Sequence, residues 1–179
     1  MIRPYKTMLN VVNEDDYLQV VEIFIVIAFY YFAASLIRPF NINPLILLLI
    51  ILIQFIGTIF FFYFFSKLYR KDISVKGFVF TFAYAYIPTL IWFIVNLILY
   101  IFLPPPRTLS LWGKGFSIVY ISFSFSIFLW KFILFYLAVR LSSKLNIYKV
   151  GYMILFYILL LIPYVQLLYY FKLFRIPFL

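Results

Sequence analysis

The sequence has 179 residues, of which 68% are hydrophobic, 25% are aromatic and only 11% are charged, and its formal net charge is +10. A soluble domain carries roughly 25% charged residues, so this composition excludes a water-soluble globular protein and predicts one membrane domain. The chain has no cysteine and no histidine, which excludes disulfides, thiol chemistry and the side chain best suited to proton transfer near neutral pH.

Residues 1–17 are expected to form a short polar segment ahead of the membrane domain. Asn13 followed by Glu14, Asp15 and Asp16 is typical of a helix N-cap with an acidic first turn. Three adjacent acids could instead hold a metal ion. Because adjacent side chains diverge around a helix, we favour the cap.

Residues 18–179 predict an all-α fold, a bundle of five transmembrane helices. Each apolar run has about the 20 residues that a helix needs to cross roughly 30 Å of hydrocarbon. Proline is tolerated in the first turn of a helix, so Pro44 suits the start of the second span, whereas Pro88 and Pro163 should kink the third and fifth spans. The expected spans are Leu18–Ile37, Pro44–Phe65, Phe78–Leu103, Phe116–Val139 and Val150–Phe171.

The fifteen Lys and Arg residues are dispersed between the apolar runs, which fits membrane insertion and not nucleic-acid binding. Nine of them belong to the N-terminal side, the loop between spans two and three and the loop between spans four and five, and five belong to the opposite side. The positive-inside rule therefore predicts a cytoplasmic N-terminus and a C-terminus outside.

Polar side chains inside the spans are the candidate site residues, because each one needs a partner or a wet cavity in lipid. Helical spacing puts Tyr84, Pro88 and Asn96 on one side of span three, and it aligns Ser117, Tyr120, Ser124 and Lys131 along span four. These faces could pack helices together or could line a substrate cavity. The candidates are Glu22, Gln54, Tyr84, Pro88, Asn96, Ser124, Lys131 and Gln166.

Lys131 is the most unusual of these residues. A lysine at the centre of a spanning helix costs roughly 2.5–3.5 kcal/mol on insertion scales, so it should be paired or hydrated. Glu22 is the only acid within a span, and one hypothesis is that the two residues pair across the bundle. The alternative is that Lys131 reaches tyrosine hydroxyls, carbonyl groups or water.

Catalysis is not expected. A Ser–Lys dyad is the one nucleophilic arrangement available without histidine, but Ser124 and Lys131 lie about 10 Å apart along a straight helix axis. The sequence shows no carboxylate pair, no metal-ligand cluster and no glycine-rich phosphate loop. It therefore predicts a non-catalytic protein without a metal or cofactor.

The third span carries a pattern that resembles a known family. Five spans, a basic loop before span three, and Gly77 followed by Ala83-Tyr84-Ala85-Tyr86-Ile87-Pro88 resemble the Yip domain family, the Ypt/Rab-interacting membrane proteins and their prokaryotic relatives. The sequence lacks the long soluble N-terminal region of eukaryotic members and their Asp-Leu-Tyr-Gly-Pro type motif. These departures argue against Rab binding and point to a prokaryotic-type member, which is expected in the plasma membrane.

The family resemblance implies a membrane scaffold, or a trafficking or assembly partner, that contacts lipids and other membrane proteins. Four cations of the loop Ser66–Lys76 are the candidate lipid-headgroup ligands, at about 1 kcal/mol per cation near an anionic surface. They could instead serve only to fix topology. The alternative function is a small transporter or permease subunit, with a polar path lined by spans three and four. The four cations are Lys67, Arg70, Lys71 and Lys76.

Overall fold

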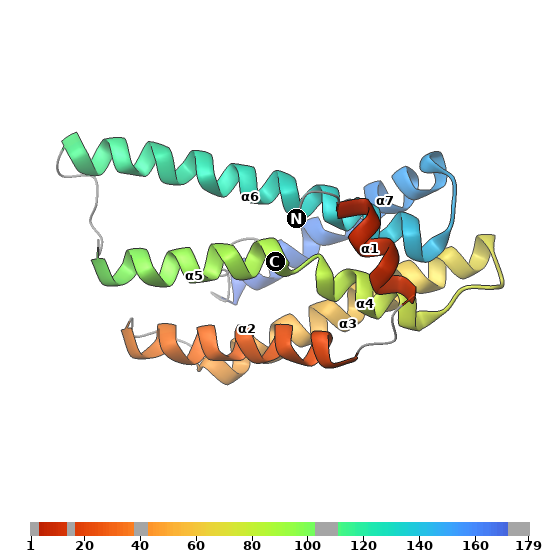
Figure 1. Ribbon diagram of the computed structural model, residues 1–179, viewed down its shortest axis with the longest axis horizontal. Helices are drawn as coiled ribbons and strands as arrows, with labels where there is room; N and C mark the ends of the chain where they lie inside the picture. The colour runs from red at the N-terminus through yellow and green to blue at the C-terminus, as the bar shows by residue number, and fades with distance from the viewer. Residues whose placement is uncertain (1–3, 14–16, 38–42, 103–110, 172–179) are drawn as a thin grey trace.

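A computed structural model describes residues 4–13, 17–37, 43–102 and 111–171 of the chain (Figure 1). These residues form helices and no strand, which confirms the predicted all-α fold. The helices are α1 (Pro4–Asn13), α2 (Tyr17–Ile37), α3 (Pro44–Tyr69), α4 (Val75–Tyr84), α5 (Ile87–Phe102), α6 (Leu111–Ser143) and α7 (Ile147–Tyr170).

Five helical segments are long and apolar enough to cross a membrane, as predicted, and α4 and α5 together make the third of them, Val75–Phe102. Several helices run past the predicted ends. The helix α3 continues to Tyr69, and α6 extends over 33 residues. Hydropathy marks only the apolar part of a helix, whereas backbone hydrogen bonding continues through residues such as Lys67 and Lys114. Residues 103–110 and 172–179, which include Pro104, Pro105 and Pro106, lie outside the described residues.

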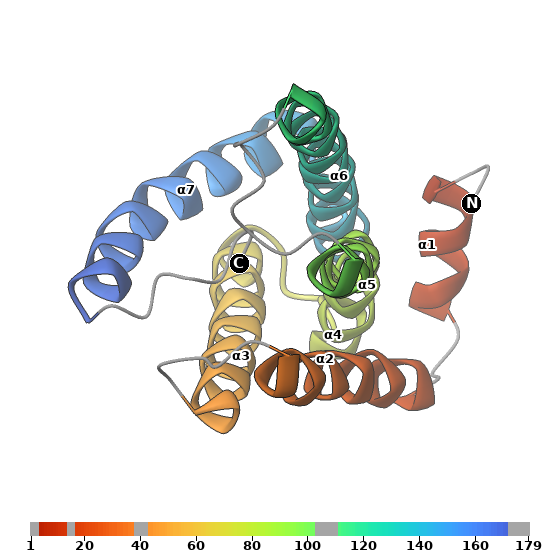
Figure 2. The same cartoon turned by 90° about the vertical axis from the view of Figure 1, so that its left-hand side faces the viewer.

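The helix α4 lies at the centre of the bundle, between α1, α2, α3 and α6 (Figure 2). Since neighbours surround it, every residue from Phe80 to Tyr86 is buried. A buried stretch without a polar face is expected where a helix is enclosed on all sides. The segment that resembles the Yip pattern is therefore the core of the molecule.

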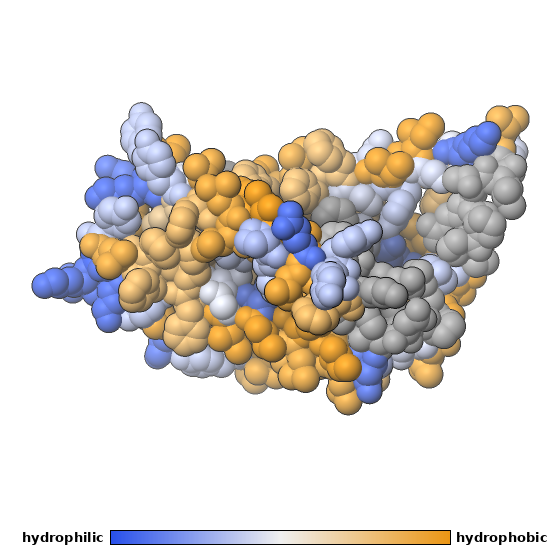
Figure 3. All heavy atoms as spheres, turned by 180° about the vertical axis from the view of Figure 1, so that it is seen from behind, coloured by the Kyte–Doolittle hydropathy of each residue, from blue (hydrophilic) through white to orange (hydrophobic). Residues whose placement is uncertain are grey.

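The sides of the bundle are apolar. Large side chains such as Phe29, Leu36 and Leu159 are exposed on α2 and α7. Figure 3 shows hydrophobic side chains covering much of the visible face, with hydrophilic ones gathered at the end where α3 meets α4 and α6 meets α7. Exposed apolar surface of this extent is suited to lipid. The protein is membrane-embedded.

The N-terminal segment differs from its prediction. It contains α1, which lies across the bundle and packs on α4 and α6 with Met8 fully buried. Asn13 is the last residue of α1 and does not cap α2, so the predicted N-cap at Asn13 is wrong. Among the described side chains of α1, Met8 is buried and Tyr5, Lys6, Leu9 and Asn10 are exposed. Glu14, Asp15 and Asp16 lie outside the described residues.

Two of the three predicted proline effects are confirmed. Pro44 is the first residue of α3, and the Asn43 side chain caps the helix by accepting a hydrogen bond from the Leu45 N–H at 2.9 Å. The third span is interrupted before Pro88, between α4 and α5. There the Tyr86 N–H bonds to the Ala83 carbonyl in place of the carbonyl four residues back. The helix α7 includes Pro163 in its interior, and the predicted kink there stays a prediction.

Candidate functional site

The interface between α5 and α6, here called the seam, is held by polar side chains of both helices. The Tyr120 hydroxyl donates to the Asn96 side-chain oxygen, and the Trp92 indole N–H donates to the Ser124 hydroxyl at 3.1 Å. Asn96 also donates to the Trp92 carbonyl at 3.0 Å. Asn96 and Ser124 were predicted to face the bundle, and both do. They bond to each other's helix, which favours helix packing over a path between spans three and four.

Two further hydrogen bonds tie the other helices together. The Thr81 and Ser142 hydroxyls lie 2.8 Å apart and join α4 to α6, and both side chains are buried. The Thr58 and Tyr157 hydroxyls lie 2.6 Å apart and join α3 to α7. In lipid such bonds contribute about 0.6 kcal/mol each on average. Nothing in the sequence identified Ser142 as the partner of Thr81 or Tyr157 as the partner of Thr58.

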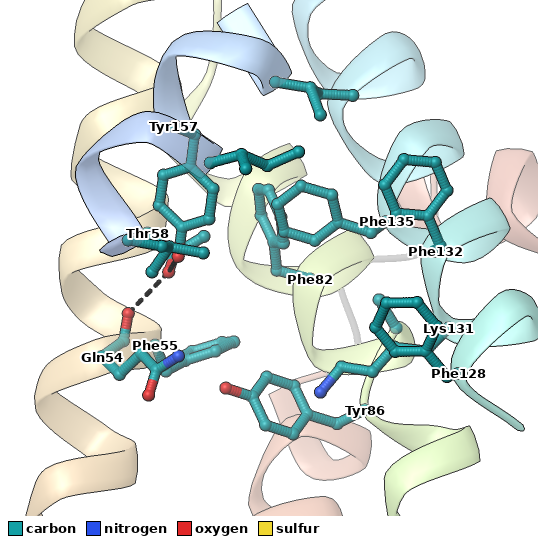
Figure 4. A pocket seen from close by; sticks show the side chains of 14 residues that line it. Gln54, Phe55, Thr58, Phe82, Tyr86, Phe128, Lys131, Phe132, Phe135 and Tyr157 are labelled. Atoms are coloured by element: carbon teal, nitrogen blue, oxygen red, sulfur yellow. Dashed lines mark hydrogen bonds between the residues drawn. The ribbon is translucent and has the colours of Figure 1, made fainter. Parts of the chain in front are cut away.

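A chamber of about 300 Å³ lies between α3, α4, α6 and α7, beside the break at Ala85 and Tyr86. Fourteen residues line it, and seven of these carry aromatic rings (Figure 4). The rings pack against one another, as in the Phe82–Phe135 and Phe135–Tyr157 pairs, whose centroids are 5.2 and 5.7 Å apart. Ligand sites in proteins have this size and this mainly apolar lining with few polar groups.

Lys131 supplies the charge of the chamber. It lies on α6, about 6 Å past the midpoint of that 33-residue helix at 1.5 Å rise per residue. Its ammonium nitrogen is 4.9 Å from the centroid of the Tyr86 ring. A cation over an aromatic face is stabilised by about 0.5–2 kcal/mol, most where water is excluded. The contact agrees with the alternative in which Lys131 reaches a tyrosine, here through the ring face of Tyr86.

Glu22 and Lys131 are not brought together. Glu22 is exposed on α2, whereas Lys131 lies in the chamber on α6. Figure 2 shows α2 and α6 on opposite sides of the central α4 and α5. The pairing hypothesis fails because the enclosed third span separates the two helices.

Gln54, on α3, lines the same side of the chamber as Tyr86 and Lys131 (Figure 4). Its side-chain oxygen is buried and has no hydrogen-bond partner. A buried acceptor without a partner loses roughly 1–3 kcal/mol of solvation. The chamber therefore combines a cation and an unsatisfied amide oxygen within apolar walls.

No family model, curated protein or solved structure matches this chain. The chamber and the helix ends must therefore be interpreted from their own chemistry. Among the described residues, no group of three or more His, Cys, Asp and Glu side chains could hold a metal ion.

The predicted headgroup ligands all lie at one end of the bundle, here called the basic end. Lys67, Arg70, Lys71 and Lys76 are exposed on α3, α4 and their connection. The α6–α7 connection lies at the same end (Figure 1). It adds the exposed cations Arg140, Lys144 and Lys149.

Several of these cations lie over tyrosine rings. Lys67 lies 5.5 Å from the Tyr63 ring centroid, and Lys149 lies 4.9 Å from that of Tyr69. Both tyrosines belong to the last part of α3. A tyrosine near a membrane surface keeps its ring in apolar surroundings and its hydroxyl in water. The basic end thus has the composition of a membrane–water boundary.

The other predicted site residues have separate places. Tyr84 and Pro88 are buried on either side of the α4–α5 break, and Gln166 is exposed on α7. Tyr86 was missed as a site residue although its motif was noted. Spacing along a straight helix favours Tyr84, but the break turns Tyr86 toward Lys131.

Proposed function

We propose that the chain is a non-catalytic, Yip-like integral membrane protein that acts as a scaffold or as a trafficking or assembly partner. It works through contacts with lipids and with other membrane proteins. The observation that carries this proposal is the basic end, where exposed cations of two connections gather beside tyrosine rings. The Yip-like segment Ala83–Pro88 lies at the core and supports the proposal through its burial.

Anionic headgroups are the natural partners of the basic end. Each Lys or Arg near an anionic leaflet contributes about 1 kcal/mol of attraction, which salt screens within about 10 Å at 0.1 M. Four exposed cations on one connection are enough to enrich anionic lipids around the protein. The apolar sides of the bundle leave surface on which other membrane proteins could pack.

The proposed location is a prokaryotic plasma membrane, with the N-terminus cytoplasmic and the C-terminus outside. The chain has no cysteine, so single cysteines report orientation cleanly. A Lys71→Cys variant should resist a membrane-impermeant maleimide in intact cells, and a Lys114→Cys variant should react. The reverse labelling would contradict this orientation.

Lipid enrichment tests the proposed function. The protein is reconstituted in nanodiscs of phosphatidylcholine with a minor fraction of phosphatidylglycerol, and the lipid retained after dilution into detergent is measured. A variant with Lys67, Arg70, Lys71 and Lys76 all changed to Gln should lose most of the phosphatidylglycerol enrichment. The matched control Lys114→Gln, at the other end of α6, should keep it. Equal enrichment in the fourfold variant and the wild type would overturn the lipid role.

A small transporter or permease subunit is the second candidate, and the chamber is the observation that favours it. The chamber is lined by α3, α4, α6 and α7 and not by spans three and four alone. A transport path needs water access from at least one side. A Lys131→Cys variant should then react with a small water-soluble thiol reagent, whereas complete protection would contradict transport through the chamber.

A further inference from the structure

The chamber has the features of a binding site for an amphiphile. Its charged lining residue is Lys131, and most of its remaining described lining is aromatic or aliphatic. Lys131, Tyr86 and Gln54 lie along one side of it, with Phe82, Phe135 and Tyr157 beyond them (Figure 4). Polar groups at one side and apolar walls elsewhere match a molecule with one polar head and one apolar tail.

The chamber opens sideways, between α6 and α7. Phe128 and Phe132 of α6 and Ile158 of α7 line it, yet each is 44–46% exposed, so they form its rim. The two helices meet at their connection and diverge from there (Figure 2). Beyond Ile154, no described residue of α7 is buried. A tail leaving the chamber would therefore enter lipid directly.

The head must be an anion. The charged residue of the lining is the cation Lys131, which lies about 6 Å from the middle of α6 with its ammonium nitrogen over the Tyr86 ring. Apolar surroundings strengthen the attraction between an ammonium cation and an anionic head group. The Gln54 amide, whose buried oxygen has no partner, can turn end for end and present its N–H groups to the chamber.

We infer that the chamber binds a long-chain carboxylate, with the carboxylate on Lys131 and the tail passing between α6 and α7. A carboxylate fits better than a phosphate monoester, which carries nearly two charges and three acceptor oxygens against the single cation of this lining. The inference rests on the proposed role of lipids as partners and adds a defined lipid class and an internal site.

Binding is tested on the full chain in a neutral detergent by native mass spectrometry. The probes are oleate, oleyl alcohol with a similar chain and no charge, and acetate with no tail. One oleate per chain should bind at least tenfold more tightly than either of the other probes. Equal binding of oleyl alcohol would overturn the ionic contact, and equal binding of acetate would overturn the tail path.

Variants locate the site. Lys131→Met should weaken oleate binding at least tenfold, whereas Lys114→Met, which removes an exposed cation of the same helix, should not. Ile158→Trp narrows the rim at an exposed position and should also weaken binding. This second variant keeps the test decisive if Lys131→Met does not fold. Unchanged oleate binding in a folded Lys131→Met or Ile158→Trp variant would overturn the inference.

The fourfold variant of the basic end separates this inference from the proposed function. If oleate binding is lost in that variant and kept in Lys131→Met, the carboxylate binds at the surface, and the chamber inference is wrong while the lipid role stands. If phosphatidylglycerol enrichment survives the fourfold variant but oleate binding needs Lys131, the chamber inference stands and the surface role fails.

Discussion

One stripe of polar side chains on α6 meets two different surroundings. At the seam, Tyr120 and Ser124 face the continuous helix α5 and bond to Asn96 and Trp92. Farther along α6, Lys131 faces the point where α4 ends and α5 has not yet begun, and there a chamber replaces a helix contact. Polar residues at the same spacing thus pack helices where the opposite helix is regular and surround a cavity where it is broken.

The comparison predicts opposite signs for the same kind of change. Removing a polar group from the seam breaks a satisfied bond and leaves its partner unpaired, which lowers stability. Removing a polar group from the chamber removes a group that apolar walls disfavour, which raises stability.

The largest effect is expected for Lys131→Met in the chamber. The change removes an insertion cost of roughly 2.5–3.5 kcal/mol and gives up the polar contacts of Lys131, among them the cation–π contact with Tyr86 of about 0.5–2 kcal/mol. The bundle should gain about 1–2 kcal/mol, measured as a higher midpoint of thermal unfolding in neutral detergent without added carboxylate. Lys114→Met should leave the midpoint unchanged. A lower midpoint for Lys131→Met would show that the lysine is structural, as the seam residues are.

Tyr120→Phe in the seam should act in the other direction. It leaves the Asn96 side-chain oxygen without the Tyr120 hydroxyl and should cost about 0.6 kcal/mol, with an upper bound near 1.7 kcal/mol. A double-mutant cycle with Asn96→Leu measures the coupling between the two residues. Tyr152→Phe on the exposed face of α7 serves as the control. Additive losses in the cycle would remove the distinction between the seam and the chamber.

Gln54→Leu is the smallest and most discriminating change. Because the Gln54 oxygen is buried without a partner, a leucine should stabilise the bundle by about 0.5 kcal/mol. The matched change Gln166→Leu, at an exposed residue of α7, should have no measurable effect. Chemical denaturation of both variants in the same detergent compares them, and a loss of stability in Gln54→Leu would mean that the amide is a structural partner after all.

Much of the fold could be predicted from the sequence, but the pairing of its polar groups could not. Five apolar runs gave the spans, and Pro88 marked the break in the third one. Helical spacing correctly put Asn96 and Ser124 toward the bundle. It could not choose between Glu22 and Tyr86 as the neighbour of Lys131, because that choice depends on which helices adjoin α6.

The sequence by itself determined that the chain lies in a membrane, because runs of about 20 apolar residues are long enough to cross the hydrocarbon of a bilayer as helices. It also determined where the helix at the centre must break, since proline cannot donate the hydrogen bond that a continuous helix requires. Only the tertiary structure decided what the break does. It places Tyr86 under Lys131 and leaves a chamber between four helices. Packing across the bundle brings together residues that are far apart in the sequence, so their spacing does not predict their contact.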